Sequence, residues 1–312
     1  MNYPTPTIPN QMIEVKKIDT FSGHRDCVYA LEAGAKPNEV FSAGGDGMVV
    51  AWDLARPDLG QPLAQMGASV YAMAFDATSD CLLVGQNYDG LHVINLSDRK
   101  EIAAIKVTSA AIFTVKIRAH NAFVGTSDGV IVVVDLKNFA IRKHIKASDQ
   151  SVRSIDFNDS TGEMAVGYSD NHVRIFDAHS FDLKRVLEPH ANSVFVVKYA
   201  PEAHYLLSAG RDARFKIWDI KNNYAQITDV PAHLFAINDV VFSPDGQHFL
   251  TASMDKTIKV WDAQSFKLLK VIDRARHAAH GTSINRLLWT NYQNQVLSAS
   301  DDRSISVWSL VF

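Results

Sequence analysis

The chain carries one sequence pattern seven times, and the period of this pattern limits the fold more than any other feature. Four copies end in a Trp, at a position called here the Trp slot: FSAGGDGMVVAWD, LSAGRDARFKIWD, LTASMDKTIKVWD and LSASDDRSISVWS. Three weaker copies between the first two have Ile94, Val134 and Phe176 in this slot. The Trp slot falls at positions 52, 94, 134, 176, 218, 261 and 308, in steps of 40 to 47 residues. The chain is therefore expected to consist of small units of one kind, arranged head to tail.

A short β-rich segment precedes each Trp slot and indicates what the unit contains. VYAL begins at Val28 and INDV at Ile237, and such a segment starts 24 residues before the Trp slot in six copies and 22 before it in the third. Turn signals such as Ser243-Pro244-Asp245-Gly246 separate stretches rich in Val, Ile and Phe. Three strands fit this interval, and an outer strand fits the interval after the Trp slot. Four strands with this period are typical of one blade of a β-propeller.

The signatures of the copies resemble the WD-repeat (WD40) β-propeller family over residues 12–312, beginning with Gly23-His24 and Trp52-Asp53. The resemblance implies an all-β chain with a single seven-bladed propeller and four antiparallel strands per blade. The chain stops at Phe312, so residues 12–21 are predicted to pair beside Trp308 and close the ring, since an open last blade would leave an unpaired sheet edge. Residues 1–11 are expected to be a flexible, proline-rich tail, either a disordered end or a tether.

Composition narrows the functional classes. The net charge of −3 argues against binding to nucleic acid or acidic membranes, which requires a basic face. Two cysteines, Cys27 and Cys81, provide no disulfide framework and favour a reducing compartment. The N-terminal residues lack the features of a signal peptide, and no apolar stretch approaches the ~18–20 residues of a membrane span. We expect a cytoplasmic protein without a membrane span or a nucleic-acid partner.

The resemblance implies a buried hydrogen-bond network of His, Ser or Thr, Asp and Trp in blades one, five, six and seven. These groups can satisfy one another in a dry site. The network residues are His24, Ser42, Asp46 and Trp52; His190, Ser208, Asp212 and Trp218; His233, Thr251, Asp255 and Trp261; and His280, Ser298, Asp302 and Trp308. In blades two to four the His slots hold Met66, Thr108 and Ser148, and the Ser slots hold Val84, Val124 and Val166. Either apolar packing replaces the network there, or this half of the ring is softer and adapts to a partner.

Several motifs look catalytic, but each has a structural explanation. Gly125 to Gly129 spells G-x-S-x-G around Ser127, yet it coincides with the turn of the repeat rather than with a strand-to-helix turn. His277 and His280 lie three residues apart, for which an ordinary polar loop is favoured over a metal site. Cys27 lies near His24, but this His belongs to the network of blade one. There is no phosphate loop or dinucleotide fingerprint. We expect no enzyme, no metal and no cofactor.

A partner is expected on the face where the channel is narrow. In the family, the second residue of each inner strand tends to point to this rim. In this chain these residues are Tyr29, Tyr71, Phe113, Arg153, Phe195, Asn238 and Asn285, and the turns add Asn87, Arg211 and Asp301. An insertion at residues 273–279 adds Arg274 and Arg276. Aromatic and Arg side chains dominate binding hot spots, although the rings could instead only fill the funnel.

The leading hypothesis is a non-catalytic scaffold that binds a peptide or loop of a partner protein on this face. Such a protein would be monomeric alone and part of a larger complex. The alternative is a small-molecule-binding or hydrolytic propeller that uses the central channel, which predicts converging carboxylates or His at the rim. Some ubiquitin-ligase adaptors in the family carry Trp-Asp-x-Arg, but here the third residue after Trp is Ala55, Lys221, Gln264 or Val311.

Overall fold

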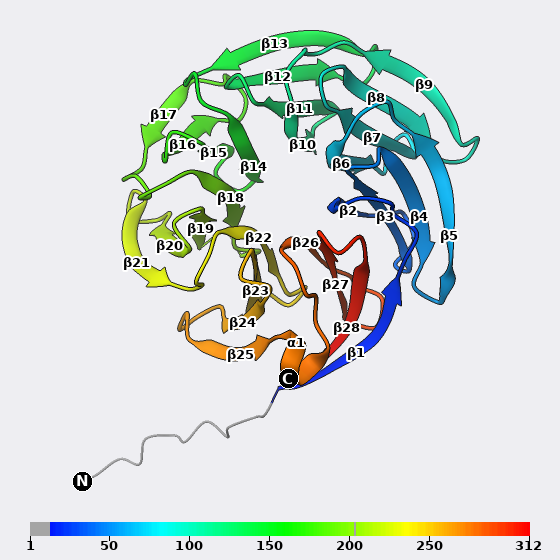
Figure 1. Ribbon diagram of the computed structural model, residues 1–312. Coiled ribbons are helices and arrows are strands. Elements are labelled where there is room, and N and C mark those ends of the chain that lie inside the picture. Colours follow the sequence, from blue (N-terminus) through cyan, green and yellow to red (C-terminus); the bar gives the residue numbers. More distant parts are fainter. Residues whose placement is uncertain (1–12, 203) are drawn as a thin grey trace.

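A computed structural model describes residues 13–202 and 204–312. These residues form seven four-stranded antiparallel sheets arranged as blades around a central axis, with the inner strands toward the axis (Figure 1). The prediction of one all-β, seven-bladed propeller is thereby confirmed. The expected tail, residues 1–11, lies outside the described residues.

Each blade runs from an inner to an outer strand in chain order, except that the outer strand of blade seven comes from the start of the chain. Blades one to three comprise β2 (Val28–Ala33), β3 (Glu39–Gly44), β4 (Met48–Asp53) and β5 (Arg56–Gln65); β6 (Val70–Asp76), β7 (Cys81–Gln86), β8 (Gly90–Asn95) and β9 (Lys100–Ile105); and β10 (Ile112–Arg118), β11 (Asn121–Thr126), β12 (Val130–Asp135) and β13 (Ala140–Lys146). Blades four and five comprise β14 (Val152–Asn158), β15 (Glu163–Tyr168), β16 (Val173–Asp177) and β17 (Leu183–Val186), and β18 (Val194–Tyr199), β19 (Tyr205–Gly210), β20 (Arg214–Asp219) and β21 (Ala225–Pro231). Blades six and seven comprise β22 (Ile237–Phe242), β23 (His248–Ser253), β24 (Ile258–Asp262) and β25 (Leu268–Ile272), and β26 (Ile284–Trp289), β27 (Gln295–Ser300), β28 (Ile305–Val311) and β1 (Glu14–Phe21).

The core lies between neighbouring blades rather than at one centre. One cluster, for example, joins Leu250 and Val260 of blade six to Leu287 and Trp308 of blade seven. The two middle strands of each blade are buried on both faces, which explains their density of Val, Ile and Leu. Outer strands such as β9 and β13 are mostly exposed and carry the charged residues.

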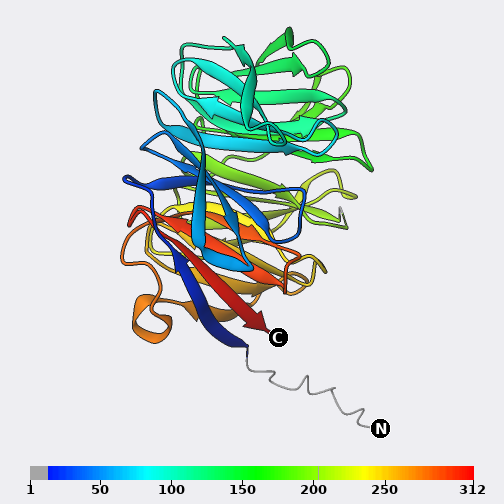
Figure 2. The ribbon, with the colours of Figure 1, turned by 90° about the vertical axis from the view of Figure 1, so that its right-hand side faces the viewer.

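The ring closes where the two ends of the chain meet. β1 pairs antiparallel with β28, with Lys17 opposite Trp308 and Phe21 opposite Ile305. Figure 2 shows the two strands side by side. The prediction that the first strand closes the ring is therefore confirmed, and the edge of β28 is covered.

A β-bulge occurs at the same place in all seven inner strands. In β2 the register shifts between Val28 and Ala30, and the corresponding shift occurs in β6, β10, β14, β18, β22 and β26. The first residue of each inner strand has no exposed surface. A bulge releases one residue from the regular ladder and re-aims its side chain. The released residue is the second of each inner strand.

Candidate functional site

The seven bulged residues all line one open pocket of about 400 Å³. We call this pocket the mouth, because it lies where the inner strands begin. The mouth is lined by Tyr29, Tyr71, Phe113, Arg153, Phe195, Asn238, Met254, Ser283, Asn285, Arg286 and Asp301. The bulge therefore gives a backbone reason for the convergence of one residue from each blade.

Five of these residues, from blades one to five, form a continuous row of ring contacts. The ring centroids of Tyr29 and Tyr71 lie 4.8 Å apart edge to face, and those of Tyr71 and Phe113 lie 5.8 Å apart and stacked. The Arg153 guanidinium lies 4.0 Å from the centre of the Phe113 ring and 4.6 Å from that of the Phe195 ring. All five side chains are partly exposed, so the row is a wall of the pocket and not a closed core.

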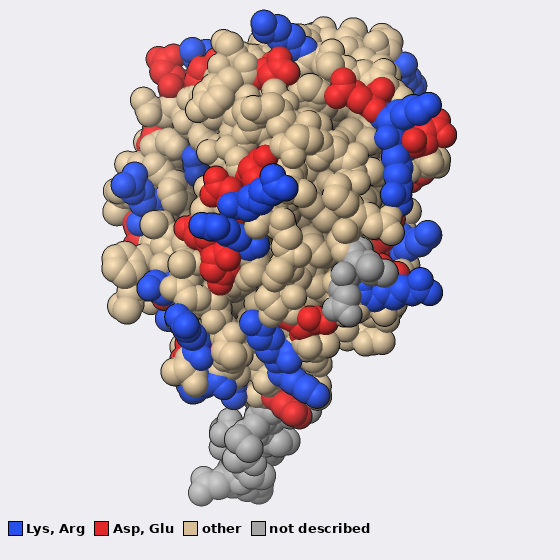
Figure 3. Space-filling model, turned by 45° about the vertical axis from the view of Figure 1, so that its right-hand side comes forward, with Lys and Arg blue, Asp and Glu red and all other residues tan. Residues whose placement is uncertain are grey.

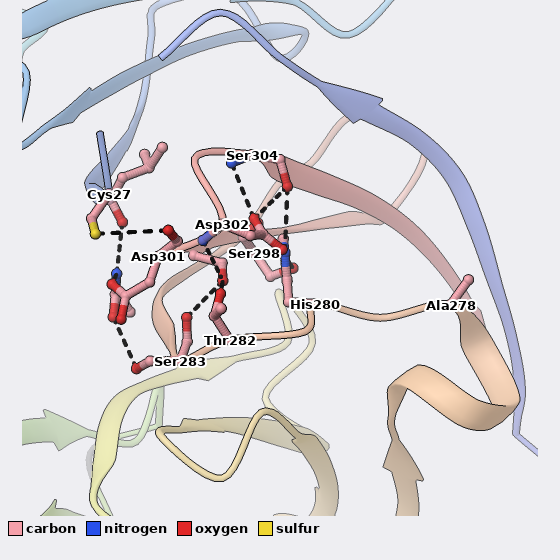
Figure 4. A network of polar contacts seen from close by, with 12 residues as sticks. Cys27, Ala278, His280, Thr282, Ser283, Ser298, Asp301, Asp302 and Ser304 are labelled. Carbon is pink, nitrogen blue, oxygen red and sulfur yellow. Dashed lines mark hydrogen bonds and ion pairs between the residues drawn. The ribbon is translucent and has the colours of Figure 1, made fainter. Parts of the chain in front are cut away.

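The opposite side of the mouth, from blades six and seven, is polar and ties the blades together. The amide nitrogen of Asn238 donates to the carbonyl of Ile284, 2.9 Å away, and that of Asn285 donates to the carbonyl of Val28, 3.0 Å away. Asn285 also donates to the Asp301 carboxylate at 2.8 Å. Figure 4 shows Asp301 between Cys27 and Ser283 in the network at this seam. The donors of both Asn side chains are therefore already used within the ring.

Four residues expected at the partner face do not line the mouth, namely Asn87, Arg211, Arg274 and Arg276. Asn87 is only 1% exposed, and its side-chain oxygen accepts a hydrogen bond from the backbone of Ile112 at 2.8 Å, so Asn87 ties blade two to blade three instead of facing solvent. Arg211 is exposed on a turn outside the mouth.

The insertion before blade seven, expected on the loop beside the channel, forms the short helix α1 (Arg274–His277) against β1. The Lys17 ammonium donates to the carbonyl of Ala278 at 3.1 Å. Asp273 caps the helix and binds the Arg276 guanidinium at 2.6 Å. Arg274 lines a separate hollow, with Gly281 and Asp302 among its other residues. Arg274 and Arg276 therefore lie outside the lining of the mouth, and their contact with a partner stays a prediction.

Sequence reasoning missed Met254, Ser283 and Arg286, which complete the lining. Met254 holds in blade six the turn position that Asn87, Arg211 and Asp301 hold in three other blades, so the repeat itself predicts that it belongs to this face. Its backbone nitrogen donates to the carbonyl of Ala236 at 3.0 Å, which joins this turn to the loop that carries Leu234 and Phe235. Leu234, Phe235 and Met254 are 85%, 61% and 50% exposed. These three residues form an apolar patch beside the mouth.

The four expected polar networks all form, with the same geometry. In blade five, the Trp218 indole donates to the Ser208 hydroxyl at 2.8 Å, and this hydroxyl lies 2.7 Å from Nε2 of His190. Nδ1 of His190 lies 2.9 Å from the Asp212 carboxylate, so a neutral ring carries its proton on Nδ1 and accepts from the hydroxyl at Nε2. The corresponding Trp bonds measure 2.8, 3.0 and 2.9 Å in blades one, six and seven.

Burial and hydrogen bonding shift the pKa of several groups in these networks. Burial lowers the pKa of His24 and of His233, which opposes their protonation. Although burial alone would raise the pKa of Asp302, hydrogen bonds from His280 and Ser304 lower it to about 2 (Figure 4). In blades one and six, burial therefore favours a neutral imidazole beside the carboxylate.

Blades two to four replace the hydroxyl by a Val with no exposed surface, at positions 84, 124 and 166. The Asp in the turn between the second and third strands of each of these blades has a partner other than a network His. Asp89 lies 3.2 Å from the ring of His92, Asp128 accepts from Thr126, and Asp170 accepts from Ser148 at 2.6 Å. This packing supports the apolar interpretation, and the softness of these blades stays a prediction.

The motifs that look catalytic lie in structural surroundings. Ser127 sits in the turn between β11 and β12, where its hydroxyl accepts a hydrogen bond from the backbone of Ala111 at 3.1 Å. Burial raises the pKa of the Cys27 thiol, which lies 3.7 Å from the carbonyl of Asp301. Over residues 13–202 and 204–312, no three His, Cys, Asp or Glu side chains are grouped in a way that could hold a metal ion. Within the same ranges, no helix has the length and hydropathy of a membrane span.

Comparison with known proteins gives matches over most of the ring. The family model described as "WD domain, G-beta repeat" matches residues 15–53, 139–177, 181–219, 225–262 and 272–309. Three curated relatives are Protein tipD of Dictyostelium discoideum (23% identical over 303 residues, 95% of this chain and 49% of that protein), Protein groucho of Drosophila melanogaster (26% over 222 residues, 65% and 30%) and Retinoblastoma-binding-like protein E of Dictyostelium discoideum (26% over 208 residues, 57% and 40%). The chain thus spans half or less of the length of these relatives.

Proposed function

Because the chain belongs to the WD40 family of G-beta repeats, we propose that it is a non-catalytic protein-interaction scaffold that binds a peptide or loop of a partner protein at the mouth of its channel. The name of one relative, Retinoblastoma-binding-like protein E, refers to binding. Fold and resemblance alone are weak guides to function, so the proposal rests on the mouth itself.

The observation that carries the proposal is the row of Tyr29, Tyr71, Phe113, Arg153 and Phe195 around an open pocket. Rings that only filled the funnel would close it, whereas these five side chains leave a hollow of about 400 Å³. Aromatic and Arg side chains bury a large area with few torsions to freeze, and they are the common anchors of protein interfaces. An extended segment or a loop fits a hollow of this size at the axis of the ring.

The apolar patch of Leu234, Phe235 and Met254 extends the same face. Large apolar side chains that cluster in an exposed position mark contact surfaces more often than isolated ones do. The loop and the turn that carry the patch are held by backbone hydrogen bonds, including the one from Met254 to Ala236. A partner segment that leaves the mouth over blade six would cover these three side chains.

The other classes have less support. A hydrolytic mouth requires an acid or base that is free to act, whereas Asp301, the one carboxylate that lines the described mouth, accepts a hydrogen bond from Asn285. On the face shown in Figure 3, basic and acidic residues are interspersed, which does not favour a nucleic-acid partner. We further propose that the protein is cytoplasmic, monomeric alone and part of a larger complex.

The test is affinity capture from native lysate with three baits, followed by mass spectrometry. The baits are the wild type, the Tyr71→Ala/Phe113→Ala variant, and an Ile102→Ala/Leu183→Ala control. Ile102 and Leu183 are apolar residues on outer strands that are 50% and 48% exposed. We expect a stoichiometric partner that is lost only from the mouth variant, whose melting temperature stays close to that of the wild type. Equal recovery by all baits would exclude the mouth, and a large loss of stability would show that the rings serve packing.

A further inference from the structure

Arg153 is a cation without a counter-ion. Its guanidinium lies between the Phe113 and Phe195 rings, and among the described residues it has no hydrogen bond or ion pair. Burial lowers its pKa to about 10, so it remains protonated at neutral pH. A guanidinium offers five N–H donors in a planar fork that matches a carboxylate, and stacking on ring faces leaves the edge of this fork free. The position is therefore prepared for an anion.

A second hollow lies directly below the mouth, within the channel, and it carries more positive than negative charge. Arg153 and Arg286 line both hollows, so the two hollows are neighbours. The lower hollow, of about 220 Å³, has four cations in its wall: Lys116, Arg153, Lys198 and Arg286. Its acids are Glu32 and Asp239.

The acids of the channel offset the charge of the two lysines only in part: Asp156 and Glu32 attract Lys116, but repulsion by Lys198 and burial outweigh them. Asp239 accepts a hydrogen bond from the backbone of Leu287 and lies 3.6 Å from the Arg286 guanidinium. Burial raises the pKa of Glu32, which favours its neutral form. Asp156, on the neighbouring strand, accepts from the backbone of Tyr199 at 2.8 Å.

Lys116 and Lys198 have no hydrogen bond or ion pair among residues 13–202 and 204–312. Repulsion by Lys198, together with burial, lowers the pKa of Lys116 to about 8. Two like charges held this way in a channel produce a positive potential beneath Arg153. A negative group that entered through the mouth would be stabilised by this potential as well as by the guanidinium.

We propose that the mouth recognises an acidic side chain, the carboxylate of an Asp or Glu carried by an otherwise apolar segment of the partner, with Arg153 as the residue that binds it. The inference rests on the proposed function and adds the chemistry of the partner. The aromatic row and the apolar patch surround the anion position with apolar surface, which suits a peptide better than a free small anion. The carboxylate faces Arg153, and the apolar residues on either side of it face the aromatic row and the apolar patch.

The experiment selects binders from a phage-displayed library of random 12-residue peptides on the full chain. Selected peptides are synthesised in three forms: as found, with the acidic residue changed to its amide, and with phosphoserine in its place. Binding is measured by fluorescence polarisation. The proteins are the wild type, Arg153→Met, Arg153→Lys and an Arg142→Gln control, which removes an exposed arginine on the outer strand β13.

We expect selected peptides to be enriched in one acidic residue flanked by apolar ones. Arg153→Met should weaken binding of the acidic peptide about 10- to 100-fold, the range of a charge-assisted hydrogen-bonded pair, and should leave the amide peptide nearly unaffected. Arg153→Lys keeps the charge but loses the planar fork, so an intermediate loss is expected. Arg142→Gln should change binding less than about 2-fold. If Arg153→Met does not fold, Arg153→Lys alone carries the comparison.

Three outcomes would overturn the inference. If the selected peptides are not enriched in acidic residues, or if Arg153→Met weakens binding of acidic and amide peptides equally, the mouth binds peptides but does not recognise a carboxylate. A phosphoserine peptide that binds more than about 10-fold tighter than its acidic counterpart would show a phosphate site instead. If no peptide is selected, or if Tyr71→Ala/Phe113→Ala binds selected peptides unchanged, the proposed function fails as well.

Discussion

Replacing Ser208 by Ala tests whether the polar networks hold the strong blades together. The Ser208 hydroxyl has no exposed surface and joins two groups that are also buried, the Trp218 indole nitrogen and Nε2 of His190, at 2.8 and 2.7 Å. Ala would leave the indole without an acceptor and the imidazole without a donor. Each unsatisfied buried group costs about 1–3 kcal/mol, so we expect a loss of about 3 kcal/mol in the free energy of unfolding.

This loss is converted into a melting temperature through the unfolding entropy. At about 2 cal/mol/K per residue, a chain of this length has an unfolding entropy of roughly 0.6 kcal/mol/K, so Ser208→Ala should melt about 5 °C below the wild type. Ser208→Thr is the matched control, because blade six uses Thr251 in the same slot with a Trp261 bond of 3.0 Å. Differential scanning calorimetry measures both variants. An Ala variant that melts within a degree of the wild type, or a Thr variant that falls as far as Ala, would refute the argument.

Two further predictions concern pH and ring closure. Burial lowers the pKa of His24 and His233 in the folded state, so below about pH 6.5 the unfolded chain binds more protons, and stability should decrease as the pH is lowered. The pKa of Asp302 is about 2 in the folded state, which adds a second loss of stability below about pH 4. Melting temperatures at pH 8, 5 and 3 check this, and equal values at pH 8 and 5 would contradict it. Deleting residues 1–21 removes β1 and exposes the edge of β28, so we expect a lower melting temperature and aggregation in size-exclusion chromatography, whereas deleting only residues 1–11 should have neither effect. A monomeric, equally stable 1–21 deletion would show that β28 needs no partner strand.

Much of the ring could be predicted because the repeat fixes local geometry. Val28 and Ile237, which begin the β-rich segments in the sequence, also begin the inner strands β2 and β22. The pairing of residues 14–21 with β28 followed from strand count alone. In both cases the periodic positions of apolar residues determine the backbone, so one sequence is sufficient.

The candidate site was harder to predict because it depends on side-chain direction. The turn of blade two offers both Asn87 and Tyr88, and the sequence does not tell which one faces solvent. Tyr88 adopts a positive φ of 66° and is 68% exposed, while Asn87 is buried. For Arg276, the spacing of the repeat predicted a loop near the axis, but a local bond to Asp273 stabilises a helical turn that packs on β1 instead.

The stacking of Arg153 between two rings shows the same limit. Phe113, Arg153 and Phe195 hold the same position in three consecutive blades, so their proximity follows from the repeat. That the guanidinium remains without an acid partner depends on where every neighbouring carboxylate points, and only the structure contains this information.

The bulge at the start of every inner strand separates the mouth from the rest of the molecule. Because the bulged residue leaves the ladder, its side chain can change without altering the register of a strand. Five such positions, in blades one to five, can therefore vary around one axis, whereas Asn238 and Asn285 also hold neighbouring blades together. Libraries restricted to these five codons, varied together because the side chains contact one another, would explore binding specificity on an unchanged architecture, and they would allow the chain to be re-engineered as a receptor for peptides of chosen charge.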